Sequence, residues 1–169
     1  MSLNQAKYNS KKFKELVLYV AQQFGGEIRG KKRLAKLLYF VDFDFFEKYE
    51  KPVTGSVYRA LPMGPFPVEF PEAIRELESD GSLSTRADQE WGEGYEPTVV
   101  YQAKREPDLS VFSKDEVAMV DRVIGKYRNL TGTELETLSH SQAPFVGTKP
   151  GEDIAYELSF YRETDFNDV

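Results

Sequence analysis

Apolar residues recur at helical spacing through the first 50 residues. In the first stretch they follow the i, i+3, i+4, i+7 pattern of an amphipathic helix: Phe13, Leu16, Val17, Val20 and Phe24. This pattern predicts a helix over about residues 10–24 that Gly25-Gly26 ends. A second helix is predicted over about residues 31–49, where apolar and aromatic residues cover nearly every side. A helix of that kind is normally buried, so we expect it at the centre of the fold.

The helical spacing stops at residues 52–55, Pro-Val-Thr-Gly, and shorter stretches follow. Residues 56–61 alternate weakly, as a short strand or an extended segment does. Residues 63–67 hold two prolines and one glycine. They exclude a continuous helix, because proline lacks a backbone N–H and moves the residue before it out of helical geometry. We therefore expect a rigid loop that presents Met63 and Phe66.

The next segment predicts a helix followed by a β-hairpin. Pro71, or equally Pro67, suits the first turn of a helix that Asp80-Gly81 ends. Residues 83–86 and 98–103 are predicted to pair as a hairpin with a wide loop. Trp91, the only tryptophan, lies in that loop, where it either folds back onto the sheet or serves as an exposed anchor. We favour the first alternative, because large exposed rings are uncommon on monomers.

Two capping boxes start helices in the last third of the chain. In each, a hydroxyl residue is followed three positions later by Glu, so that each side chain caps a backbone N–H of the other. Ser113 with Glu116 begins one helix, and Thr131 with Glu134 begins another that Pro144 ends.

The last predicted element is a short helical segment over residues 154–161, with Ile154, Leu158 and Tyr161 on one side and an acidic, frayed tail after it. Together these elements predict an α+β fold: a mainly helical domain with a small antiparallel β-hairpin or sheet. The 169 residues suit one domain, so we expect a single unit over residues 1–169 with frayed ends.

The charge is unevenly distributed along the chain. Nine Lys or Arg face two Glu within residues 1–40, so that part is +7 and the remainder of a chain with net charge −6 is −13. Four of these cations make a candidate nucleic-acid patch: Lys31, Lys32, Arg33 and Lys36. The alternative is a solvated helix face that pairs with the protein's own acidic surface, which we favour because the overall acidity opposes phosphate binding.

Groups that catalyse common reactions are scarce. The absence of cysteine excludes thiol catalysis and thiolate metal sites. His140 is the only histidine, and nothing resembling a nucleophile elbow accompanies it, so a structural role is favoured over a general base. No phosphate loop, dinucleotide fingerprint or zinc spacing occurs, and we expect no cofactor and no metal. The chain also lacks a long apolar run or a secretory leader, and a cytoplasmic protein is expected.

Acidic residues on the central helix need structural partners. Asp42 and Asp44 point about 200° apart on a helix, so they cannot share one ion alone. A buried carboxylate requires a donor, and for Asp42 we expect Arg59 or a tyrosine hydroxyl. Asp42 is therefore predicted to be a structural residue, and a structural role is also expected for Tyr39 and Gly55.

Two sequence blocks carry a family resemblance. Residues 36–70 place an aromatic helix, a Pro-Val-Thr-Gly turn, a Tyr-bearing segment and a Gly-Pro breaker in a fixed order, and residues 138–145 read LSHSQAPF. In both blocks the chain resembles the SocA-like antitoxin family, also called the Panacea domain, which is often phage-associated. The matching positions are Lys36 to Phe40, Asp42, Thr54-Gly55, Tyr58, Gly64-Pro65, Leu135 and Ser139-His140. Phe145 stands where family members often have tryptophan, and Pro71 is unusual in its helix.

The resemblance implies a mainly helical domain that neutralises a toxin by binding it. Most of the matching positions look like fold determinants, but we expect a partner-binding surface that includes Tyr58, Met63, Gly64, Pro65, Phe66 and His140. The leading hypothesis is a non-enzymatic, antitoxin-like module for a toxin encoded nearby, acting by direct blocking or by delivery to a protease or chaperone. The alternative is a winged-helix-like DNA-binding regulator that uses the basic N-terminal third. An enzyme comes third.

Overall fold

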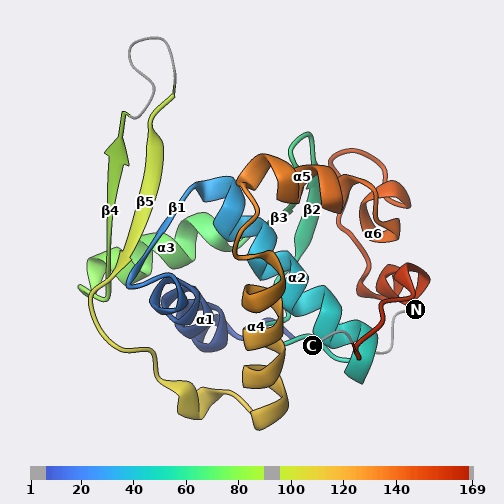
Figure 1. Ribbon diagram of the computed structural model, residues 1–169, viewed down its shortest axis with the longest axis horizontal. Helices are drawn as coiled ribbons and strands as arrows, with labels where there is room; N and C mark the ends of the chain where they lie inside the picture. The colour runs from blue at the N-terminus through green and yellow to red at the C-terminus, as the bar shows by residue number, and fades with distance from the viewer. Residues whose placement is uncertain (1–6, 90–95, 168–169) are drawn as a thin grey trace.

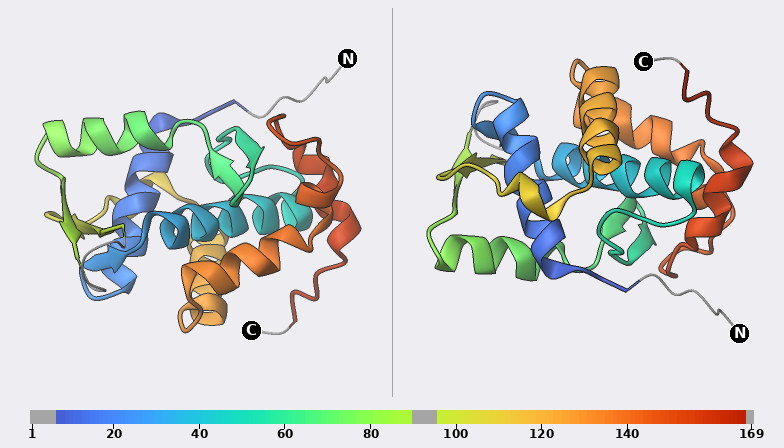
Figure 2. Two further views of the ribbon diagram at one scale, coloured as in Figure 1. Left: turned by 90° about the horizontal axis from the view of Figure 1, so that it is seen from above. Right: turned by 90° about the horizontal axis from the view of Figure 1, so that it is seen from below.

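A computed structural model describes residues 7–89 and 96–167, and one long helix organises it (Figure 1). Helix α2 (Lys31–Tyr49) crosses the middle of the molecule, and both further views show other helices on either side of it (Figure 2). Every residue from Leu34 to Phe46 is buried. The central, buried helix predicted from its apolar circumference is therefore confirmed.

The surrounding helices begin and end where local chemistry favours it. Their bounds are α1 (Ser10–Gln23), α3 (Phe70–Ser79), α4 (Lys114–Tyr127), α5 (Gly132–His140) and α6 (Ala143–Val146). Both predicted capping boxes are present, at Ser113 with Glu116 and at Thr131 with Glu134. Pro144 does not end α5 as predicted: the helix stops earlier, at His140, and the proline occupies the first turn of α6, where its missing N–H costs nothing.

A three-stranded antiparallel sheet stands beside α1 and α3 (Figure 1). Its order is β1 (Glu27–Arg29), β5 (Thr98–Ala103), β4 (Leu83–Asp88), and the predicted hairpin forms its β4–β5 part. Strand β1 was not predicted, because three residues are too few to show alternation. Trp91 lies outside the described residues.

A separate two-stranded hairpin packs on α2. Its strands are β2 (Tyr58–Leu61) and β3 (Gly64–Pro67), so the predicted rigid loop over residues 63–67 is instead a strand. Pro65 and Pro67 pair with Ala60 and Tyr58, whose backbone groups bond outward to residues 151–154 and not toward β3. Neither proline therefore needs an N–H, which explains how an edge strand with two prolines forms.

The C-terminal segment runs along the surface, and around Thr164 it is held against α2. A 3-10 turn, η1 (Leu109–Val111), precedes α4, and a longer one, η2 (Tyr156–Arg162), follows residues 151–154. Tyr161 was predicted to lie on one side with Ile154 and Leu158, but Ile154 is buried and Tyr161 is 76% exposed, since the buried row of η2 contains Ser159 and Arg162. The tail was expected to fray, yet the Thr164 backbone N–H and hydroxyl both donate to Glu47, at 2.7 Å each.

Aromatic side chains fill much of the core, as the composition suggests. On α2, the ring centroid of Tyr39 lies 5.1 Å from that of Phe40 and 4.6 Å from that of Phe43. Phe40 stacks on Tyr127 of α4 at 4.4 Å, and Phe43 lies 4.6 Å from Tyr156 of η2. These contacts join the central helix to elements far away in sequence. Among the described helices, none has the length and apolar character needed to cross a membrane.

Candidate functional site

The buried Asp42 carboxylate holds the β2 hairpin to the central helix. It accepts hydrogen bonds from the Thr54 backbone N–H at 2.7 Å, the Thr54 hydroxyl at 2.5 Å and the Tyr58 hydroxyl at 2.7 Å. The predicted tyrosine donor is thus present, whereas Arg59, the other candidate, pairs with Asp153 at the surface. Burial raises the pKa of Asp42 to about 6, although the three donors oppose the shift.

Two glycines allow backbones to approach closely around these contacts. Gly55 has φ +74°, and a Cβ there would lie 2.5 Å from the Lys7 carbonyl oxygen. Gly64 has φ +102°, and a Cβ there would lie 2.8 Å from Lys36 Cε and 3.0 Å from Ser139 Oγ. Both positions therefore exclude a side chain, and the structural role predicted for Gly55 has a geometric cause.

Lys36 lies inside the molecule, which corrects its prediction as part of a surface basic patch. Its side chain passes beside Gly64 and donates from Nζ to the Pro65 carbonyl at 3.0 Å. That carbonyl is on the outer edge of β3, where no strand pairs with it. Burial lowers the pKa of Lys36 to about 8. The lysine thus supplies a donor to a buried carbonyl on the unpaired edge of β3.

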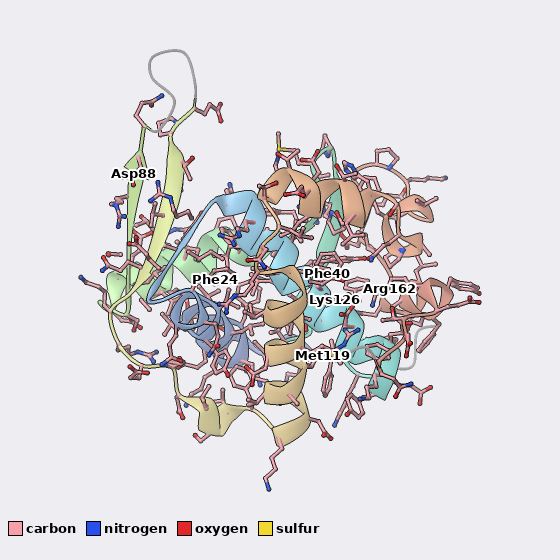
Figure 3. The ribbon with its side chains drawn as sticks, viewed as in Figure 1. Phe24, Phe40, Asp88, Met119, Lys126 and Arg162 are labelled. Atoms are coloured by element: carbon pink, nitrogen blue, oxygen red, sulfur yellow. The ribbon has the colours of Figure 1, made fainter. Side chains whose placement is uncertain are left out.

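A second buried network, missed from the sequence, links α2 to η2. Asp44 accepts from Arg122 at 3.0 Å and from Arg162 at 2.7 Å, and Arg162 also pairs with Glu47 at 2.8 Å. Figure 3 places Arg162 between η2 and α2. Burial lowers the pKa of Arg162, but Asp44 and Glu47 outweigh it, so the pKa is raised overall. The guanidinium stays charged and anchors the C-terminal segment.

The same network reaches Tyr39, predicted to be structural. The Tyr39 hydroxyl donates to Gln142 Oε1 at 2.8 Å, and Arg162 donates to the same oxygen at 3.1 Å. Gln142 lies between α5 and α6, so this contact fixes the LSHSQAPF block on the central helix. The two sequence blocks behind the family resemblance are therefore in contact in the fold.

Only part of the expected partner-binding surface is exposed. Met63, at the hairpin turn, is 59% exposed, and Phe66 is half-buried with Lys31 Nζ 5.3 Å from its ring. Gly64 and Pro65 are buried beneath the turn. Tyr58 is buried as well, which corrects its expected place on the surface: its hydroxyl is needed by Asp42.

His140 packs against the aromatic ring of Phe145. Its ring centroid lies 4.4 Å from that of Phe145, and its Nε2 is buried without a hydrogen-bond partner in the described residues. A catalytic histidine is normally oriented by such a bond. This geometry gives His140 a packing contact at the edge of α5, within reach of the surface.

The other three cations of the proposed basic patch lie at the start of α2. Lys31 is exposed, Lys32 pairs with Glu136 at 2.8 Å, and Arg33 donates to the Arg128 carbonyl at 2.6 Å. A hollow of about 540 Å³ is lined by Lys32, Arg33 and neighbouring residues including Arg29. Part of the positive charge is therefore compensated within the chain, as the favoured alternative expected.

The fold and these contacts define a class of protein: a mainly helical α+β scaffold. A hydrogen bond joins its two sequence blocks, residues 36–70 and 138–145. The family described as antitoxin SocA-like, Panacea domain, matches residues 34–144, and the chain belongs to it. That range runs from the central helix to α6 and leaves out α1 and η2. Comparisons with curated proteins and with solved structures returned no match.

Proposed function

We propose that this chain is an antitoxin that neutralises a toxin protein encoded nearby by binding it, without catalysis. The observation that carries the proposal is membership of the SocA-like antitoxin family over residues 34–144. The geometry supports it, because Asp42 and Lys36 at the matching positions each hold one piece of the scaffold to another. Their polar groups are therefore used in contacts within the fold, and we expect other, exposed residues to bind the toxin.

The hairpin turn is one surface that suits a partner. Met63 projects from a two-residue turn between β2 and β3, and the strands below it are fixed by Asp42 and Lys36. A rigid support lowers the entropy lost on binding. Met63, Phe66 and His140 are the residues of the expected surface that we retain for contact with the toxin.

The proposed setting is the cytoplasm, with the toxin gene beside the antitoxin gene and, as the family resemblance suggests, an association with phage. Neutralisation occurs by direct blocking of the toxin or by its delivery to a protease or chaperone. Following the toxin level in cells separates these routes: blocking leaves the toxin intact, whereas delivery shortens its lifetime.

Co-expression tests the proposal. The neighbouring gene is expressed alone, with this protein, and with a Met63→Ser variant. We expect growth arrest when the neighbouring gene is expressed alone. We expect growth when the wild-type protein is co-expressed, and co-purification of the two proteins. A neighbouring gene that is harmless alone, or that remains lethal and never co-purifies with the wild type, contradicts the function.

DNA binding is the second candidate, and the basic hollow beside α2 is the observation that favours it. Lys31 is free to contact phosphate, whereas Lys36 is not, since it is buried. The test is a mobility shift of promoter DNA with wild type and with a Lys31→Ala, Lys32→Ala, Arg33→Ala variant. Steep salt dependence that the variant loses supports this candidate, and no shift at low salt removes it.

A further inference from the structure

The corner between α6 and η2 carries exposed apolar side chains that the fold does not bury. Val146 on α6 is 69% exposed, and on η2 Phe160 is 43% and Tyr161 is 76% exposed. Isolated exposed apolar residues are ordinary, but two consecutive partly exposed rings on η2, with an exposed valine on the neighbouring helix α6, are of the kind that marks contact sites. All three lie beyond residue 144, outside the range of the family match.

The exposed rings are held on a rigid support. In a 3-10 helix, residues three apart share a face, and Tyr156, Ser159 and Arg162 form the inner face of η2. The Tyr156 ring stacks on Phe46 at 5.3 Å, Ser159 is fully buried, and Arg162 pairs with Asp44. The outer face therefore presents Phe160 and Tyr161 with little freedom to lose on binding.

The same corner carries two carboxylates for which no ion pair is seen among the residues that the structure describes. Glu157 lies on the row of Phe160, and Glu163 follows the end of η2; both are exposed. Within residues 146–163, all of which the structure describes, neither carboxylate has an ion pair, and Lys149 is the one exposed cation. The exposed aromatic side chains are thus bordered by carboxylates.

We propose that this corner is where the toxin docks, and that the toxin presents a basic face with an apolar recess for Tyr161 and Phe160. The inference rests on the proposed antitoxin function and specifies the chemistry of its partner. Exposed aromatic side chains on fixed supports are the usual energetic anchors of interfaces, and a charged border selects a partner of opposite sign.

The acidic border also distinguishes among occupants. Nucleic acid or an anionic membrane would place phosphate against Glu157 and Glu163, which is repulsive. A second copy bound about a two-fold axis would bring like carboxylates toward each other, since both copies use the same patch. A basic protein surface gains binding free energy both from burying the rings and from attraction to the carboxylates. Residues 151–154 join the β2 hairpin to η2, so the Met63 turn and this corner belong to one rigid unit.

The experiment measures the affinity of the purified toxin, the product of the neighbouring gene, for wild type and variants by calorimetry at low and high salt. We expect Tyr161→Ser to weaken binding at least tenfold. Glu157→Gln with Glu163→Gln should weaken it severalfold at low salt and flatten the salt dependence. The matched controls are Leu109→Ser, another exposed apolar residue at 39%, and Asp115→Asn, an exposed acid on α4; both should bind within twofold of wild type.

The outcomes separate this surface from the function itself. If the wild type does not bind the toxin, the proposed function fails. If the wild type binds and Tyr161→Ser binds equally well, the function stands and this surface is wrong. Self-association that Tyr161→Ser abolishes while toxin binding is unchanged also overturns it. Thermal melts verify that each variant is folded. If Tyr161→Ser melts at a lower temperature than wild type, Val146→Ser on α6 tests the same surface in its place.

Discussion

Replacing the buried Lys36 by Met provides a test of the central packing with a defined pH signature. Burial lowers the pKa of Lys36 from 10.5 to about 8, so charging it in the folded protein costs free energy. At about 1.36 kcal/mol per pH unit, the cost at neutral pH is about 3 kcal/mol. The hydrogen bond from Nζ to Pro65 returns about 1.5–3 kcal/mol, so Lys36→Met should change stability little at pH 7.

The pH dependence separates the two contributions. Because the folded-state pKa of Lys36 is depressed, neutral Lys36 favours folding; that contribution is complete above pH 10.5 and is lost as pH falls through about 8. Between about pH 7 and about pH 9.5, the wild type should therefore gain about 2 kcal/mol of unfolding free energy relative to Lys36→Met. Titrations shared by both proteins cancel in this difference.

Urea unfolding of both proteins across that pH range is the measurement. Lys104→Met, at an exposed lysine, controls for the loss of a positive charge as such. If the unfolding free energies of wild type and Lys36→Met run parallel across the range, the lysine is not desolvated in the way the structure shows. The assignment of Lys36 to the core would then be refuted.

Three further substitutions test the remaining contacts. Asp42→Ala should lower the unfolding free energy by about 3 kcal/mol in urea titrations, because Thr54 and Tyr58 lose their acceptor; Asp42→Asn, which keeps one oxygen, should cost less. Gly55→Ala should cost about 1–3 kcal/mol by calorimetry, whereas Gly125→Ala, in open space on α4, should be neutral or stabilising. Arg162→Met should lower the unfolding free energy by about 3–5 kcal/mol, because Asp44 and Glu47 lose their shared cation. It should also speed amide hydrogen exchange selectively in η2. An equal change in exchange rate throughout the protein would count against this anchor.

The helices were predictable because their signals are local. The apolar period gave α1 and α2, and the Ser113 and Thr131 capping boxes marked the starts of α4 and α5 within one residue. Strand β3 was not predictable in the same way. Its two prolines argue against a strand unless their missing N–H groups are known to point away from β2. That direction follows from the β2–β3 register, which places Pro65 and Pro67 opposite Ala60 and Tyr58 and which no local pattern gives.

The polar contacts of the site were only partly predictable. A buried Asp42 with a tyrosine donor follows from one carboxylate on an apolar helix, and the structure supplies Tyr58. Arg162 and Asp44 are separated by 118 positions, and no local pattern joins them. Lys36 was misplaced because a lysine beside other cations suggests a surface, whereas the core lies on its side of the helix.

The most direct test of non-catalytic neutralisation is a titration of the purified toxin with this protein, following toxin activity and complex formation in the same samples. We expect toxin activity to fall in proportion to a complex of fixed stoichiometry and to return when the complex dissociates. Loss of activity at far below stoichiometric amounts, without a complex, would mean that the protein turns over a substrate and would contradict neutralisation by binding.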